Sequence, residues 1–361
     1  MNQPVLAADA PAGQSRRMRR YAALLLMLLL AACAGGSAGH LAAPAAIGNA
    51  VPPAGPPVEP ALTDKVLVAA DGARLPLRTW LPAGKPRAVI LALHGFNDYS
   101  YAFAMPATAW AAEGIATYAY DQRGFGEAPE RGRWPGTRQL ADDLTTASRL
   151  LRARYPGVPL FCLGESMGGA VVATAASGLS GAPKPDCDGI ILVAPAVWGR
   201  ETMNVFERVA LWTGDTFFPD MTLTGRGLHI WPSDNIPMLR QLAADPLVIK
   251  ATRIDTIAGL VNLMDAALAS APKITLPMML LYGNRDEIVP KEPTRLFIAD
   301  LPYADRNQRR IAWYSDGYHM LLRDVEGPMV WRDIESWIAN PHAPFPSAAD
   351  RNASVLLYAE R

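Results

Sequence analysis

Six short, almost continuously apolar runs recur along the chain, and they constrain its fold more than any other feature. The runs are AVILALHG (88–95), IATYAYDQRG (115–124), PLFCLG (159–164), GIILVAP (189–195), PMMLLYG (277–283) and RRIAWYS (309–315). Such runs are typical of strands buried on both faces, as in a parallel sheet covered by helices. The stretches between them carry helical spacing, as in residues 137–154. The sequence therefore predicts an α/β fold with helices on both faces of a mostly parallel sheet.

The domain that contains these runs is expected to span residues 62–339. Two further strands, at 64–70 and 74–80, flank the turn sequence DGA and bring the predicted sheet to eight strands. The alternation stops over about 197–275, which predicts a helical insertion covering the carboxyl edge of the sheet. Residues 340–361 have no strong periodicity and are expected to form a loosely attached tail.

The amino terminus has the layout of an export signal. Residues 15–33 read SRRMRRYAALLLMLLLAAC, with four arginines before an apolar run, which predicts a signal peptide over residues 1–32. The ending LAAC resembles a bacterial lipobox. That resemblance implies cleavage before Cys33 and lipidation of its sulfur; an ordinary signal peptide with a chance cysteine is the alternative. The expected location is the bacterial cell envelope, lipid-anchored, in the outer membrane facing the periplasm, with residues 33–61 as an Ala/Pro/Gly-rich tether.

Charge and cysteine content exclude several other classes of protein. The 34 basic and 34 acidic residues balance, and no basic stripe indicates a nucleic-acid partner. The three cysteines and five histidines are scattered without metal-ligand spacing, so neither a metal nor a cofactor is expected. Cys162 lies within an apolar run and Cys187 shortly before the next. Both are expected to be buried free thiols, too far apart to bridge.

A serine stands in the pentapeptide GESMG (164–168), directly after the run 159–164 and before the small apolar sequence GAVVATAA. A serine hydroxyl becomes a strong nucleophile only when a neighbouring base takes its proton. The pattern Gly-x-Ser-x-Gly between a strand and a helix is typical of a strained turn that exposes the serine. This context predicts Ser166 as a nucleophile at the carboxyl end of a strand.

The base and its orienting acid are expected after later strands. His319, in SDGYHML, follows the last apolar run and precedes the last predicted helix. Its imidazole needs a carboxylate to fix the tautomer and stabilise the imidazolium. Asp286, in LLYGNRDEIVP, fits this role; the adjacent Glu287 is the alternative, with a longer side chain further past the turn. The order Ser, Asp, His matches that of the α/β-hydrolases.

The tetrahedral oxyanion of an acyl transfer needs backbone N–H donors held in place before the reaction. One donor is expected from Met167, directly after the nucleophile. The other is expected from the loop HGFNDYS that follows the run 88–95, through the N–H of Phe96. His94 directly precedes Gly95 at the strand end, and we interpret it as a residue that shapes this loop rather than as a base.

Several segments together resemble the monoacylglycerol lipase and lysophospholipase branch of the serine α/β-hydrolases, also described as serine aminopeptidase S33-like. They are LHGFNDYS, YDQRGFGEAPERGRWPG, CLGESMGGAV, LLYGNRDEIVP and DGYHMLLRD. The resemblance covers about residues 62–339. It implies an α/β-hydrolase fold, a triad of Ser166, Asp286 and His319, and oxyanion donors at Phe96 and Met167. It also implies that 197–275 is a lid with an apolar acyl-chain channel.

These features predict a membrane-tethered serine ester hydrolase that forms an acyl-enzyme on Ser166. A monoacylglycerol or a lysophospholipid is the expected substrate. Fold does not determine function, so a general carboxylesterase, or a peptidase or amidase on the same fold, is an alternative. The non-enzyme alternative is a scaffold lipoprotein with an inactive hydrolase fold.

Overall fold

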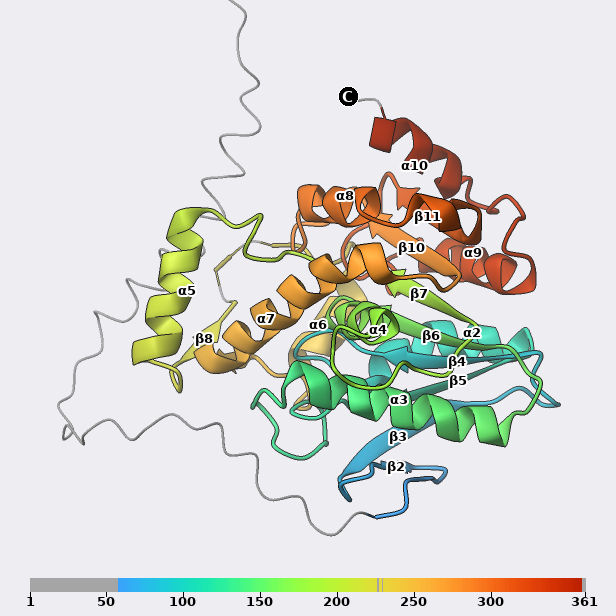
Figure 1. Cartoon of the computed structure of the whole chain (residues 1–361), viewed down its shortest axis with the longest axis horizontal. Helices are drawn as coiled ribbons and strands as arrows, with labels where there is room; N and C mark the ends of the chain where they lie inside the picture. Colours follow the sequence, from blue (N-terminus) through green and yellow to red (C-terminus); the bar gives the residue numbers. More distant parts are fainter. Residues whose placement is uncertain (1–57, 226, 229, 359–361) are drawn as a thin grey trace, which may run out of the picture.

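Nine strands form one sheet in the part of the chain that the computed structural model describes, which is residues 58–225, 227, 228 and 230–358. Their order is β1-β2-β3-β5-β4-β6-β7-β10-β11 (Figure 1). The strands are β1 (Ala61–Leu62), β2 (Val66–Val68), β3 (Arg74–Trp80), β4 (Ala88–Leu93), β5 (Ile115–Tyr120), β6 (Leu160–Glu165), β7 (Gly189–Val193), β10 (Met278–Gly283) and β11 (Arg309–Tyr314). The predicted signal peptide, Cys33 and nearly all of the tether lie outside the described residues.

The pairing of the strands confirms the predicted mostly parallel sheet. Every neighbouring pair from β5 across to β11 is parallel, while β1, β2 and β3 pair antiparallel with their neighbours. The sheet has one strand more than the eight expected. The additional strand is β1, whose two residues are too few to produce an apolar pattern in the sequence.

Two layers of helices cover the faces of the sheet (Figure 1). One layer contains α3 (Thr137–Arg154), α4 (Met167–Ser177), α7 (Ile254–Ser270) and α8 (Lys291–Ala299), and the other contains α2 (Ala104–Ala112) and α9 (Gly327–Ala339). Each layer closes its own apolar core; on the α2 and α9 side, the fully buried Trp110 and Trp337 are among the largest side chains. These cores hold the carboxyl ends of the parallel strands at one edge.

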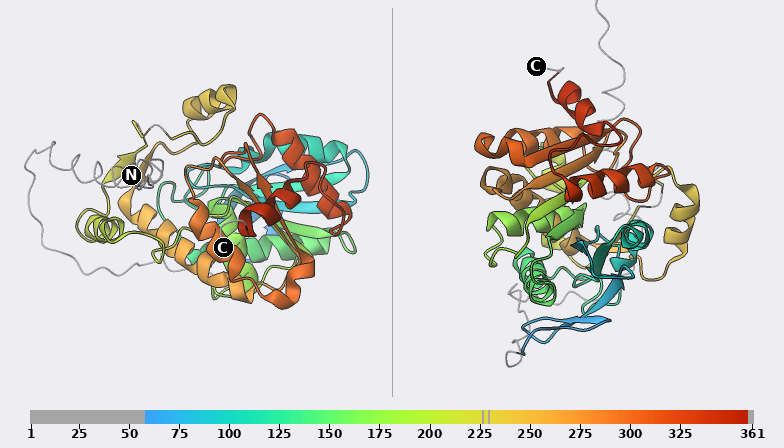
Figure 2. Two further views of the ribbon diagram at one scale, coloured as in Figure 1. Left: turned by 90° about the horizontal axis from the view of Figure 1, so that it is seen from above. Right: turned by 90° about the vertical axis from the view of Figure 1, so that its right-hand side faces the viewer.

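The insertion after β7 contains helices and a small two-stranded antiparallel sheet. Its elements are α5 (Val205–Phe217), β8 (Thr222–Thr224), α6 (Ile236–Ala244) and β9 (Ala251–Arg253), followed by α7. Helices α5 and α6 project from the helical layers, as Figure 2 shows. Residues 254–273, which include α7, form the one described helix that is long and apolar enough to cross a membrane, and most of it is buried inside the domain. That helix packs against α4, so the insertion is anchored in the core.

The expectation of a loosely attached carboxyl-terminal tail is wrong for the described residues. Helix α10 (Ala349–Tyr358) lies beside β11, and Phe345 and Ala349 are buried against the core. Arg310 of β11 forms an ion pair with Asp350, and its guanidinium carbon lies 4.7 Å from the centroid of the Phe345 ring. Three prolines, at positions 341, 344 and 346, precede this helix and interrupt any helical pattern in the sequence of the tail.

The two described cysteines are free and buried, as expected, but their expected separation is wrong. The segment before β7 already runs alongside β6, where the N–H of Asp188 donates to the carbonyl of Leu160 at 2.7 Å. This places Cys187 beside Cys162. The neighbouring Cys187 thiol, followed by burial, raises the pKa of the Cys162 thiol.

Candidate active site

Ser166 occupies a strained turn between β6 and α4. Its backbone angles are φ 54° and ψ −116°, a conformation that costs energy for a residue other than glycine. The turn is fixed to the sheet because the N–H of Ser166 donates to the carbonyl of Val193 at 2.9 Å. A Cβ atom at Gly168 would lie 2.1 Å from the carbonyl oxygen of Leu93, so this position of the motif requires glycine. The turn therefore holds the serine at the carboxyl edge of the sheet.

The structure brings His319 and Asp286 together from the loops after β11 and β10. Nδ1 of His319 lies 2.8 Å from Oδ2 of Asp286, and both side chains are buried. The other carboxylate oxygen of Asp286 accepts the N–H groups of Ile288 and Val289 at 2.8 and 2.9 Å. Burial opposes a charge on His319, but the charge and hydrogen bond of Asp286 outweigh it, so the pKa of this imidazole is raised.

Glu287, the alternative acid, has a different partner. Its carboxylate accepts the N–H of Trp231, in the insertion, at 3.0 Å. Asp286 is thus the acid that is hydrogen-bonded to His319, and Glu287 connects the loop after β10 to the insertion.

Ser166 and His319 line the same cavity, which has a volume of about 530 Å³. The loop after β4 borders it as well: Phe96 lines the cavity, and a Cβ at Gly95 would lie 3.4 Å from the Cβ of Ser166. Met167 is the first residue of α4, where backbone N–H groups are not used within the helix. Of the five residues predicted for catalysis, Phe96, Ser166 and His319 line the cavity, while Asp286 is hydrogen-bonded to His319 and Met167 directly follows Ser166.

His94 holds the loop after β4. Its Nε2 accepts the N–H of Gln122 at 2.9 Å, and its Nδ1 lies 2.8 Å from the carbonyl oxygen of Gly95. Since Nε2 is an acceptor, the proton is on Nδ1 and the ring is neutral. Burial lowers the pKa of His94, in keeping with this state. Both ring nitrogens are engaged with backbone groups, which supports a loop-shaping role.

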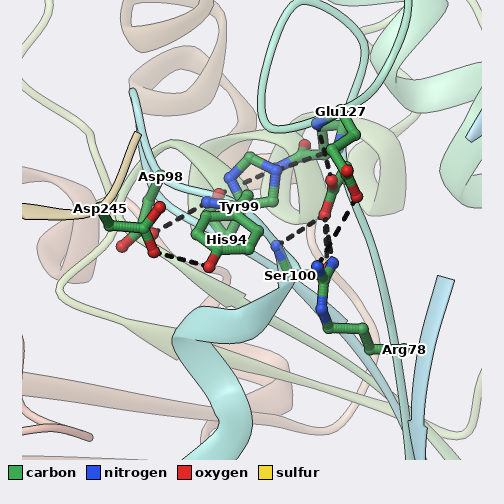
Figure 3. A network of polar contacts seen from close by, with 9 residues as sticks. Arg78, His94, Asp98, Tyr99, Ser100, Glu127 and Asp245 are labelled. Atoms are coloured by element: carbon green, nitrogen blue, oxygen red, sulfur yellow. Dashed lines mark hydrogen bonds and ion pairs between the residues drawn. The ribbon is translucent and has the colours of Figure 1, made fainter. Parts of the chain in front are cut away.

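A buried aspartate holds the rest of this loop. Oδ1 of Asp121 accepts the N–H of Ser100 at 3.0 Å and lies 3.2 Å from Nη1 of Arg78, while Oδ2 accepts the N–H of Glu127 at 2.9 Å. Figure 3 shows Arg78, Ser100 and Glu127 gathered on one side of this network. The loop beside Ser166 is therefore fixed by contacts that do not involve the cavity.

The insertion is hydrogen-bonded to the loop after β4. In Figure 3 the Tyr99 ring points toward Asp245, and its hydroxyl donates to that carboxylate at 2.7 Å. The side-chain amide of Asn97 donates to the hydroxyl of Thr252 at 2.7 Å. This side of the insertion is therefore attached to the loop that contains Phe96.

A second part of the insertion is attached to the His319 loop. The N–H of Met320 donates to the carbonyl of Pro232 at 2.9 Å, and the hydroxyl of Ser233 donates to the carboxylate of Asp324 at 2.6 Å. Asp324 also accepts the N–H of Tyr318 at 2.8 Å. Burial, opposed by these hydrogen bonds, raises the pKa of Asp324 to about 6. The insertion thus contacts the loops that carry Phe96, Asp286 and His319.

Four further charged residues line the cavity that the sequence motifs did not single out. They are Asp98, Glu165, Glu207 and Arg323, all of them buried. Glu165 stands inside the GESMG motif, and Arg323 lies four residues after His319. A charged residue within a segment expected to be buried is the sequence signal that could have identified them.

The fold, with a strained serine before a helix and a histidine–aspartate pair at the same strand edge, defines the α/β-hydrolase class. Within that class, the family model described as "Serine aminopeptidase, S33" matches residues 84–326. The chain belongs to this family.

Relatives with assigned names agree with this membership. The chain is 28% identical to mouse monoglyceride lipase over 286 residues, which cover 76% of this chain and 89% of the relative. It is 25% identical to the monoacylglycerol lipase of Mycolicibacterium smegmatis, covering 74% and 94%. The solved structure of a soluble variant of monoglyceride lipase from Saccharomyces cerevisiae, in complex with a substrate analog, superposes with a TM-score of 0.62 at 21% identity, covering 80% and 96%. The chain is a carboxylic ester hydrolase.

Proposed function

We propose that this enzyme hydrolyses the ester of a single-chain lipid, a monoacylglycerol or a lysophospholipid, through an acyl-enzyme on Ser166. The observation that carries the proposal is the cavity beside Ser166 and His319, which is lined mainly by apolar side chains of the insertion. Among them are Leu211, Met221, Ile257, Leu260 and Met264. Its size lies within the range of pockets that bury most of a small ligand. An acyl chain bound there would have its ester carbonyl at Ser166.

The proposed chemistry assigns one task to each group. Oγ of Ser166 attacks the ester carbonyl while His319 accepts the hydroxyl proton, and Asp286 stabilises the imidazolium that forms. The N–H groups of Phe96 and Met167 bind the resulting oxyanion. The imidazolium returns its proton to the leaving alcohol, and the carbon–oxygen bond to that alcohol breaks. Water, deprotonated by His319, then attacks the acyl-enzyme and releases the fatty acid.

The outer surface of the insertion supports a lipid substrate. Helix α5 exposes several large apolar side chains; Phe206 is 80% and Trp212 is 62% exposed. Exposed apolar side chains clustered on one element favour contact with a lipid surface. Anchoring through a lipidated Cys33, in the outer membrane facing the periplasm, remains our proposal for where the enzyme meets this surface.

A hydrolysis panel tests the substrate class. We expect kcat/KM for a long-chain monoacylglycerol or lysophospholipid to exceed that for p-nitrophenyl acetate by at least about tenfold, because each methylene buried in the cavity contributes about 0.8 kcal/mol. Aminoacyl amides are expected to be cleaved far more slowly than either ester. A preference for short soluble esters would replace the lipid assignment with a general esterase, and a preference for amides would replace it with a peptidase.

A further inference from the structure

The guanidinium of Arg323 connects three loops at the edge of the cavity. Its Nη1 lies 2.8 Å from Oδ2 of Asp98, and its Nη2 lies 3.1 Å from Oε2 of Glu165. Asp98 belongs to the loop after β4, two residues beyond Phe96. Glu165 is the last residue of β6, directly before Ser166. Arg323 itself belongs to the loop that carries His319.

This contact is buried, so the charged groups must be paired in a well-defined geometry. The side chains of Asp98, Glu165 and Arg323 are 7%, 2% and 6% exposed. A buried charge is tolerated only when it is paired with good geometry. Burial raises the pKa of Glu165 although Arg323 opposes this change. The arginine therefore offsets the burial of two carboxylates that come from two different loops.

We propose that Arg323 is a positioning residue, whose guanidinium fixes the oxyanion loop, the serine turn and the His319 loop relative to one another. The proposal rests on the proposed function, because it concerns the geometry of the same reaction. An arginine suits this task because its planar group holds two nitrogens in a rigid fork: Nη2 donates a hydrogen bond to Glu165, and Nη1 forms the ion pair with Asp98. A lysine would keep the charge but present a single ammonium, which cannot reproduce this fork.

The cluster also contributes charge beside His319. The groups that act on this imidazole are Asp286 and Glu165, whose negative charges raise its pKa, and Arg323, whose positive charge lowers it. His319 must be neutral to accept the proton of Ser166, so kcat/KM rises with pH through the pKa of His319. Removing the charge of Glu165 lowers that pKa and moves the rising limb of the profile to lower pH.

The first test replaces Arg323 by lysine. We expect Arg323→Lys to lower kcat for a soluble ester by about 10- to 100-fold with KM changed less than about threefold, because small displacements of reacting groups are costly. Arg152→Lys is the matched control. Arg152 also contacts two carboxylates, Asp186 at 3.1 Å and Asp188 at 2.9 Å, but lies away from the cavity lining. Equal kcat values in the two variants, both folded by circular dichroism, would overturn the proposal.

The second test uses Glu165→Gln, which keeps an oxygen that can accept from Arg323 and removes one charge. The Glu165→Gln variant tests the proposal even if Arg323→Lys does not fold. We expect the rising limb of kcat/KM to lie at lower pH than in the wild type. If the rising limb of kcat/KM lies at the wild-type pH and kcat also equals the wild-type value, the proposal is overturned. Failure of the proposed function is distinct, since the wild-type enzyme itself would then not hydrolyse lipid esters.

Discussion

Ser166→Ala is expected to lower kcat for ester hydrolysis by about 10⁶-fold, as removal of the nucleophile does in other serine hydrolases. The side chain stands in a strained turn at the cavity edge, with φ 54°, and no other serine lines that cavity among the described residues. The measurement is the initial rate on a p-nitrophenyl ester, with substrate binding followed separately.

Ser177→Ala is the matched control for this prediction. Ser177 is a buried serine at the other end of α4, where its hydroxyl donates to the carbonyl of Thr174 at 2.8 Å. Its loss can alter stability, but it removes nothing from the cavity. Retention of activity in Ser166→Ala that is comparable with Ser177→Ala would contradict the assignment of the nucleophile.

Asp286→Asn is expected to lower kcat by about 10⁴-fold, because an asparagine can hold His319 in the wrong tautomer and cannot stabilise its positive charge. The carboxylate oxygen 2.8 Å from Nδ1 of His319 is the group that is lost. Parallel measurements of kcat on the same ester, for Asp286→Asn and Glu287→Gln, compare the two adjacent acids.

Glu287→Gln is expected to cause a far smaller loss. The carboxylate of Glu287 accepts from Trp231 in the insertion, and the amide oxygen of glutamine can accept the same hydrogen bond. A loss in Glu287→Gln that equals or exceeds the loss in Asp286→Asn would exchange the roles of the two acids.

The sequence predicts the architecture well wherever burial is continuous. The central strands are covered on both faces, so their apolar runs stand out, and β4, β6 and β10 begin and end within two residues of the predicted ranges. The elements at the edges are less visible. The two residues of β1 are too few to form an apolar pattern, and the position of α10 depends on contacts with distant residues such as the pair of Arg310 with Asp350.

The candidate site likewise contains residues that the sequence predicts and contacts that it does not. Ser166, Asp286 and His319 follow from their places after strands, because parallel strands bring their carboxyl ends to one edge. The contact of Arg323 with Asp98 and Glu165 joins residues up to 225 positions apart. No local pattern specifies it. The proximity of Cys162 and Cys187 was missed for a related reason, since it depends on where the chain runs before β7 begins.

Mapping the adduct formed with a long-chain alkyl fluorophosphonate tests the assignment of Ser166 as the nucleophile. We expect one adduct, on the peptide that contains Ser166, formed more slowly in the presence of a long-chain monoacylglycerol and absent from Ser166→Ala. An adduct on a different residue, or hydrolysis of monoacylglycerol that continues while Ser166 is fully modified, would contradict this assignment.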